Sequence, residues 1–326
     1  MHKLILVMLF LSLPVLAKPI IIFDTDFGAD ADDMGALAML NHMHNAERCE
    51  LLAVMNWNNE RHALPAIAAV NAYYGNPEIK LGTRKDGLWE ADWQYSKPLV
   101  DALGSAGASI DATPSTTDLY RRLLTQAEDH SITIVTVGPL LNILQLLESQ
   151  PDDISSRSGK ELVENKVKEF VIMGGAFPSS EWEWNFNGNM PGVTQKVLET
   201  LQVPVVFSGY EVGQAIKTGE ALNRLDPKHP LYISYRHFSE HAPWMKDSFD
   251  GDISPNPSYD QTAVLYAVAG GLDKWWTLSP AGEVIADDKG GNQWRETAEG
   301  LHRYLILTGD NQKLQQVILD AMLGKG

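Results

Sequence analysis

The fold of this chain is decided by the stretch Ile20–Leu40, which reads IIIFDTDFGADADDMGALAML. It begins with an apolar, β-branched run, Ile20–Phe23, that predicts a buried parallel strand. After a turn, Met34–Leu40 is apolar nearly all round and predicts a buried helix. Five carboxylates stand within ten residues at the junction, namely Asp24, Asp26, Asp30, Asp32 and Asp33. The stretch therefore predicts a strand, an acidic turn and a helix at the edge of a core.

The acidic turn carries more negative charge than a strand end holds without a cation. Asp32 and Asp33 stand where the free N–H groups and positive dipole end of the helix stabilise carboxylates. Asp24, Asp26 and Asp30 are left facing one another across the turn. Because carboxylates held this close repel one another, we expect an oxygen-seeking ion such as calcium or magnesium to neutralise them.

Three other interpretations fit this turn less well. An EF-hand calcium loop needs glycine where Ala29 stands and glutamate where Gly35 stands. A phosphatase of the haloacid dehalogenase type also ends its first strand with Asp-x-Asp, but its motif has Thr or Val in place of Gly28 and leaves the three later aspartates unexplained. Turn and helix-capping roles alone account for one or two of the five carboxylates.

The rest of the chain alternates strand-like and helix-like segments, a pattern typical of an open, mostly parallel, Rossmann-like α/β sheet with helices on both faces. The further strands expected are Leu51–Met55, Ile79–Leu81, Ile132–Val137, Val167–Met173 and Val203–Phe207. The further helices expected are Ala63–Tyr74, Thr116–Glu128, Leu140–Glu148, Val193–Leu201, Gln261–Ala269 and Gln312–Leu323. A hairpin-like pair is expected at Glu283–Ala286 and Arg303–Leu307, and 84–113 and 226–258 look like excursions.

Length and composition bound the domain organisation. The chain has 326 residues, of which 44% are hydrophobic, enough for one large domain, which we place at 18–326. Residues 1–17 have the short basic start, apolar middle and small-residue exit of a secretory signal peptide, with cleavage expected after Ala17. The apolar run is too short to span a bilayer, and Lys18-Pro19 breaks its continuation. We therefore expect an exported protein, periplasmic or secreted, with no membrane insertion after processing; the alternative is an uncleaved buried helix.

Charge and cysteine content exclude several classes of function. The formal net charge is −16, whereas binding to nucleic-acid polymers or anionic membranes requires a basic surface. Cys49 is the single cysteine, so the chain has no internal disulfide framework and no thiolate metal cluster. A small-molecule ligand remains allowed.

The N-terminal motif resembles that of the inosine-uridine-preferring nucleoside hydrolase family, in which a first strand ends in Asp-x-Asp and a later Asp-Asp opens a helix. Here these residues are Asp24, Asp26, Asp32 and Asp33. The turn carries extra residues relative to the shortest family form, which leaves open whether Asp30 or Asp32 takes the inner acidic position. The resemblance implies the nucleoside hydrolase fold.

Four further segments match the family in the right order, from residue 20 to the end of the chain. After the strand that ends near Val137, the Gly-Pro-Leu-Leu-Asn segment resembles one in which a backbone carbonyl binds calcium, here that of Val137. A Met-Gly-Gly segment is followed by Glu183 and Asn185, which match a pair that grips sugar hydroxyls, with Trp184 as a pocket wall. Asp260 matches a late calcium-binding aspartate.

The fourth match is Asn56-Trp57-Asn58-Asn59 after the second strand, where the family places an asparagine near the sugar. We favour Asn59, with Asn58 as the alternative. In some members a histidine that protonates the leaving base precedes the late aspartate, but here that residue is Tyr259.

A proton donor for the leaving base is therefore sought among Tyr259 and the second excursion. His237 and His241 are four residues apart there, and with Tyr235 and Trp244 they are the local candidates; we favour His241 beside Tyr259. The same two histidines also have the spacing of a zinc pair, but no third ligand is near.

The resemblance implies hydrolysis of the N-glycosidic bond of a ribonucleoside to free base and ribose. Calcium held by Asp26, Asp33, the Val137 carbonyl and Asp260, with Asp30 or Asp32 nearby, would bind a water that Asp26 activates as general base. Homodimers or homotetramers would be similar to the family. Two alternatives stay open: an exported protein that binds a nucleoside or sugar in a calcium-dependent way without turnover, and a hydrolase of another riboside.

Overall fold

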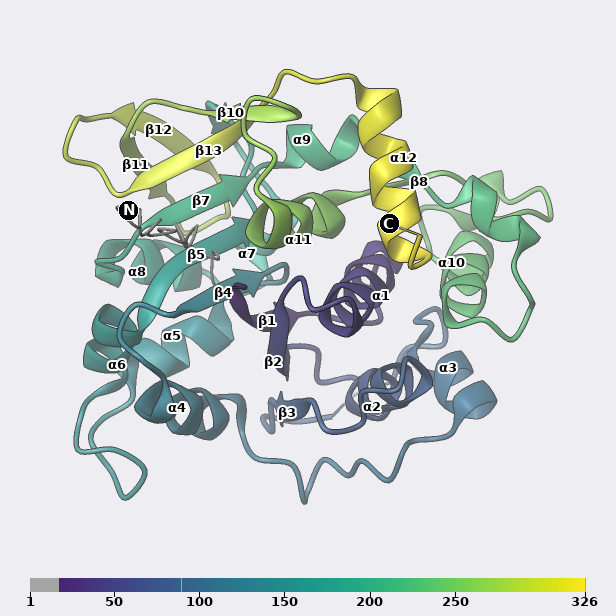
Figure 1. Ribbon diagram of the computed structural model, residues 1–326, viewed down its shortest axis with the longest axis horizontal. Coiled ribbons are helices and arrows are strands. Elements are labelled where there is room, and N and C mark those ends of the chain that lie inside the picture. Colours follow the sequence, from purple (N-terminus) through teal and green to yellow (C-terminus); the bar gives the residue numbers. More distant parts are fainter. Residues whose placement is uncertain (1–17, 89, 326) are drawn as a thin grey trace, which may run out of the picture.

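The computed structural model describes residues 18–88 and 90–325. Within this part of the chain, parallel strands form the centre of the sheet in the order β3-β2-β1-β4-β5-β7-β13 (Figure 1). Their bounds are Ile20–Thr25 for β1, Glu50–Asn56 for β2, Lys80–Thr83 for β3, Ile132–Thr136 for β4, Val167–Met173 for β5, Val205–Ser208 for β7 and His302–Leu307 for β13. The expected open, mostly parallel α/β sheet is confirmed.

Helices cover both faces of this sheet, because alternate residues of each strand point to opposite sides. Ile21 and Phe23 of β1 belong to one buried cluster and Ile22 to the other. One face carries α1 (Ala31–Asn45), α2 (Ala63–Tyr73), α3 (Ser96–Leu103), α10 (Pro230–His241), α11 (Tyr259–Ala269) and α12 (Asn311–Met322). The other carries α4 (Thr116–Gln126), α5 (Leu141–Glu148), α6 (Gly159–Lys166) and α8 (Val193–Thr200) (Figure 1).

The expected hairpin is only half right. β11 (Gly282–Ala286) pairs antiparallel with β12 (Asn292–Glu296). β12 was not predicted from the sequence because its residues are mostly polar. The segment around Arg303–Leu307 forms β13, which instead pairs parallel with β7 and touches β11 through one residue pair. A turn closed by hydrogen bonds between Asp287 and Gly291 brings β11 and β12 together locally, and this local closure explains the pairing.

Both excursions contain helices that the sequence analysis missed. α3 lies within 84–113, and α10 lies within 226–258, where Pro230 occupies its first turn and His229 caps it. Short elements complete the fold: β6 (Ser179–Ser180), β8 (Lys217–Thr218), β9 (Asn256–Pro257), β10 (Trp276–Leu278), α7 (Trp184–Asn187), α9 (Tyr210–Gln214), η1 (Glu220–Arg224) and η2 (Lys246–Ser248).

The sheet order sets the place of a ligand site. From β1 the chain moves first to β2 and β3 on one side and then to β4 and β5 on the other, so the order reverses between β1 and β4. Ligands of open α/β sheets bind at the carboxyl ends of strands next to such a reversal. The predicted signal peptide, 1–17, lies outside the described residues. Among the described residues, none of the helices combines the length and the apolar character that crossing a membrane requires.

Candidate functional site

A cavity of about 920 Å³ opens at the carboxyl ends of the central strands. Its wall includes side chains that follow β1, β2, β3, β4, β5 and β7, together with the start of α11. One part of the wall is acidic and includes Asp26, Asp32, Asp33 and Asp260. Another part is aromatic and includes Trp182, Trp184, Tyr210 and Trp244.

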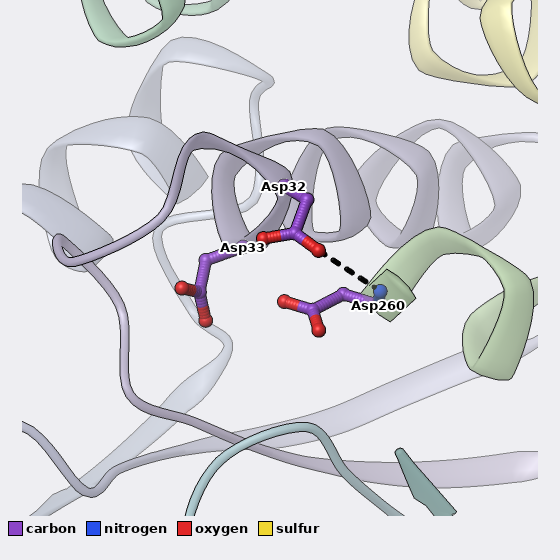
Figure 2. Close-up of side chains that lie close together, drawn as sticks. All are labelled: Asp32, Asp33 and Asp260. Carbon is purple, nitrogen blue, oxygen red and sulfur yellow. Dashed lines mark hydrogen bonds between the residues drawn. The ribbon is translucent and has the colours of Figure 1, made fainter. Parts of the chain in front are cut away.

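Three carboxylates of the acidic part lie close enough together to hold one ion. Oxygens of Asp32, Asp33 and Asp260 are all within 4.8 Å of one another. Figure 2 shows the three carboxylates turned toward a common space, two from the start of α1 and one from the start of α11. The backbone N–H of Asp260 donates to Asp32 Oδ2 at 3.2 Å, which ties the two helix starts together. Burial, and then repulsion among neighbouring aspartates, raises the pKa of all three well above the ordinary value.

Asp26 lies beside this trio in the same cavity wall. Its Oδ2 accepts a hydrogen bond from the indole Nε1 of Trp184 at 3.3 Å. Gly138, after β4, packs directly against it, since a Cβ there would stand 2.9 Å from the Asp26 side chain and backbone. Burial raises the pKa of Asp26 to about 7, and charge on Asp30 and Glu183 contributes in the same direction. Asp26 is therefore a buried carboxyl held in place by its neighbours, and burial favours its protonated form.

Asp30 and Asp24 have different surroundings. Asp30 caps α1 and accepts a hydrogen bond from Asn256 Nδ2 at 2.6 Å. Asp24 is not part of the cavity wall: its carboxylate accepts hydrogen bonds from Tyr120 at 2.9 Å and from Asn142 at 3.0 Å. Between Asp30 and Asp32, the carboxylate that joins Asp33 and Asp260 is Asp32.

The donor set of the acidic part fits a hard divalent cation. Every candidate ligand is an oxygen, and the trio is buried, so its mutual repulsion is relieved by protons or by a cation. The Val137 carbonyl also reaches the cavity wall, where it accepts a hydrogen bond from Asn185 Nδ2 at 2.7 Å. A carbonyl oxygen has a second lone pair, which leaves it able to bind a cation as well.

The predicted sugar-binding segment also lies at this cavity. Glu183 caps α7, and its carboxylate accepts the backbone N–H groups of Gly175, Asn185 and Phe186 at 2.8–3.0 Å. Glu183, Trp184 and Asn185 all belong to the cavity wall. The sequence prediction brings these three together with Asp26, and the structure agrees on their placement.

Asn58 and Asn59 both lie in the cavity wall, but they differ in how far their side-chain amides are already engaged in hydrogen bonds. Asn58 is buried, and its amide donates to the carbonyls of Asp26 and Phe27 and to Gln94 Oε1. Asn59 is half-buried, with one long contact of 3.4 Å to the Asp86 carbonyl. Asn58 thus holds the chain after β1, while Asn59 is the more available to a ligand.

The two predicted proton donors are placed differently. Tyr259 lies in the cavity wall, stacks on Tyr210 with ring centroids 5.3 Å apart, and donates its hydroxyl to Gln214 Oε1. His241 is exposed and is not part of the cavity wall; it stacks on His237 at 4.1 Å. The structure does not bring His241 to the acidic residues.

Several residues of the wall were not predicted from the sequence, and two of them closely follow strands. Arg84 directly follows β3, pairs with Asp86 and lies over the Trp57 ring at 4.7 Å. Tyr210 follows β7 by two residues. Inspecting what comes after every strand would have found both.

The fold and the cavity together define an α/β protein with an oxygen-rich, acidic ligand site at the carboxyl edge of its sheet. The family model described as inosine-uridine preferring nucleoside hydrolase matches residues 21–302. The chain belongs to this family.

Relatives and solved structures agree with this assignment. The pyrimidine-specific ribonucleoside hydrolase RihB of Escherichia coli O1:K1 / APEC is 28% identical over 154 residues, which cover 44% of this chain and 43% of the relative. The chain thus aligns with about half the length, or less, of the curated relatives it matches. The plant nucleoside hydrolase PpNRh1 has the same fold, with a TM-score of 0.68, 17% identity and coverage of 94% of this chain and 99% of that one. A purine-preferring ribonucleoside hydrolase from Gardnerella vaginalis gives a TM-score of 0.68 at 16% identity, with the same coverage.

Proposed function

We propose that this protein hydrolyses the N-glycosidic bond of a ribonucleoside, releasing the free base and ribose. The observation that carries the proposal is the placement of Asp26 beside the Asp32, Asp33 and Asp260 cluster in one cavity. Membership of the nucleoside hydrolase family supports the same reaction.

Calcium is the cation we propose for the cluster, held by Asp33, Asp260 and Asp32 with Asp26 and the Val137 carbonyl at its side. When bound, calcium supplies positive charge that orients ribose hydroxyls and makes a nearby water more acidic. Asp26 is the general base, and it accepts the proton of the water that attacks the anomeric carbon. The Trp184 indole N–H, at 3.3 Å from Asp26 Oδ2, holds this carboxylate in one orientation.

The remaining residues bind and stabilise the sugar. Glu183 and the side-chain oxygen of Asn185 provide acceptors for vicinal hydroxyls, since the Asn185 amide N–H groups are donated to the Val137 and Met173 carbonyls. The Asn59 amide is available from the carboxyl end of β2. As the bond to the base breaks, positive charge develops on the ribose ring, and the buried carboxylates stabilise it.

We also propose that the mature protein begins at Lys18 and is exported, on the basis of the N-terminal pattern alone. Mass spectrometry of the chain from the periplasm or culture medium of an expressing cell tests this directly. A mature mass that still includes residues 1–17 would contradict it.

The function is tested by incubating the purified mature chain, in calcium, with a panel of purine, pyrimidine and nicotinamide ribosides. Free base is measured by chromatography and ribose by a reducing-sugar assay. Equal amounts of base and ribose from at least one riboside are expected. Calcium-dependent binding of ribosides with no release would show instead a nucleoside-binding protein.

A further inference from the structure

Exposed aromatic side chains surround the mouth of the cavity. Four of them are 40–58% exposed in the described structure, namely Trp182, Trp184, Tyr210 and Trp244. Large aromatic surface left open around a cavity marks a place where a ligand is covered. The faces of these rings attract cations, and indole does so most strongly.

The charged residues of the cavity wall also favour a cationic ligand. Its carboxyl groups are Asp26, Asp30, Asp32, Asp33, Glu183 and Asp260. The cationic side chain among the described wall residues is Arg84, and its guanidinium is already paired with Asp86. The wall therefore carries six acidic groups and no unpaired cationic side chain among its described residues, a composition that favours a cationic ligand over an anionic one.

Apart from its carboxyl groups, which we assign to the cation and the sugar, the cavity wall offers little to protonate a leaving base. Its described residues include no histidine, lysine or cysteine. The Tyr259 hydroxyl proton is donated to Gln214 Oε1. Glu183 is held as an acceptor by three backbone N–H groups. A neutral base leaves with a negative charge unless an acid protonates it, whereas a cationic base leaves as a neutral molecule.

From these observations, and resting on the hydrolase function proposed above, we infer that the preferred substrates are ribosides whose base carries a permanent positive charge, such as a pyridinium or an N7-alkylated purine. In the reaction the bond between the anomeric carbon and the ring nitrogen breaks. Its electron pair goes to the nitrogen, which loses its positive charge. The water oxygen bonds to the anomeric carbon, and Asp26 takes the released proton. No acid is needed.

The inference is tested with matched substrates that differ in charge. We would measure kcat/KM for 7-methylguanosine against guanosine, with nicotinamide riboside as a second, chemically unrelated cation. Each value is divided by the uncatalysed hydrolysis rate in the same buffer, since cationic ribosides are intrinsically more labile. After this correction 7-methylguanosine is expected to exceed guanosine by about tenfold or more, equivalent to about 1.4 kcal/mol, and nicotinamide riboside to exceed guanosine as well.

Tyr259→His provides a second readout, because it places a group that titrates near neutral pH beside the cluster. The variant is expected to raise kcat for guanosine more than kcat for 7-methylguanosine, so the ratio between them narrows. Equal or better use of guanosine by the wild type, with turnover of both, overturns the inference but leaves the hydrolase function in place. Turnover of only one class of cation refutes charge as the determinant. Turnover of no riboside refutes the proposed function, and the inference with it.

Discussion

The acidic and aromatic parts of the cavity wall are built from different regions of the fold. Asp26, Asp32, Asp33 and Asp260 sit at strand ends and helix starts and are at most 6% exposed. Trp182 and Trp244 come from connecting segments, Tyr210 begins the short helix α9, and the three are 43–58% exposed. Two of these carboxylates also accept hydrogen bonds that fix them: Asp33 from the Thr25 hydroxyl and Asp32 from the backbone N–H of Asp260.

This difference suggests that the acidic part carries out the reaction and that the aromatic part determines which substrate is preferred. Groups that exchange protons or hold a cation need fixed distances, which the sheet edge and the helix starts supply. Groups that cover a base need a large contact area more than an exact position. Connecting segments can supply this area, and they tolerate sequence change. Changes in the acidic part should therefore alter kcat and stability, and changes in the aromatic part should mainly alter substrate preference.

The largest effect is expected for Asp26→Asn, which removes the proposed general base but keeps the size of the side chain and an oxygen that accepts hydrogen bonds. We expect kcat to fall by about 10²–10⁴-fold, with riboside affinity changed much less. Steady-state kinetics and calorimetric titration measure the two.

Asp24→Asn is the matched control, because Asp24 lies near the end of β1, which Asp26 directly follows, but outside the cavity wall. It should lower the free energy of unfolding by about 1–3 kcal/mol through its bonds to Tyr120 and Asn142. If Asp24→Asn lowered kcat as much as Asp26→Asn does, the proposal that Asp26 acts in the reaction and Asp24 only in stability would be contradicted.

The next largest effect is expected in the pH dependence of the free energy of unfolding of the metal-free protein. Burial raises the pKa of Asp24 and Asp26 to about 7, from 3.8. The folded protein therefore binds more protons than the unfolded chain between these pKa values. Its free energy of unfolding falls as pH rises from about 4 to about 7, by up to about 1.4 kcal/mol per pH unit for each carboxyl.

Calcium should weaken or reverse this dependence, because it binds ionised carboxylates and stabilises by about 2.7 kcal/mol at one hundred times its Kd. Denaturant unfolding with chelator and with excess calcium, at several pH values, measures both curves. A metal-free protein that becomes more stable as the pH rises through this range would show that the carboxyls are not buried together.

A smaller effect is expected for Trp184→Phe, which keeps an aromatic ring but removes the N–H that contacts Asp26. Loss of one such hydrogen bond costs about 1 kcal/mol, or about fivefold in kcat. Trp182→Phe is the control, because its ring lies 6.5 Å from that of Trp184 and has no contact with Asp26 among the hydrogen bonds of the structure. Equal effects of the two variants would mean that Trp184 acts only as a wall.

The smallest effect is expected for His241→Ala. The side chain is exposed and outside the cavity wall, so kcat/KM should stay within about twofold of the wild type. A tenfold loss at neutral pH would instead restore the sequence-based prediction that His241 protonates the leaving base.

Local patterns predicted most of the acidic part. The apolar run before Asp24 and the helix after Asp33 are contiguous in sequence, and Asp260 stands at the start of another apolar helix. Periodicity and helix-start preferences act over a few residues, so a sequence shows them directly.

Features that depend on distant pairing escaped prediction. The partners of β11 and β13 are set by packing between remote segments, which periodicity does not report. The contact between Trp93 and Trp244, with ring centroids 5.2 Å apart, joins the two excursions and is equally non-local. Helix α10 was hidden because proline is typical of turns and because histidine and aromatic residues have only intermediate helix propensity, although proline is compatible with a first helical turn.

The most direct test of a cation site in the acidic part is calorimetric titration of the metal-free protein with calcium, in the wild type and in Asp260→Asn. We expect one ion per chain in the wild type and an affinity at least about 100-fold weaker in the variant, since a carboxylate ligand is lost. Exposed Asp101→Asn, on α3, serves as the charge-matched control and should bind as the wild type does. No calcium binding by the wild type, or equal binding by Asp260→Asn, would contradict the site.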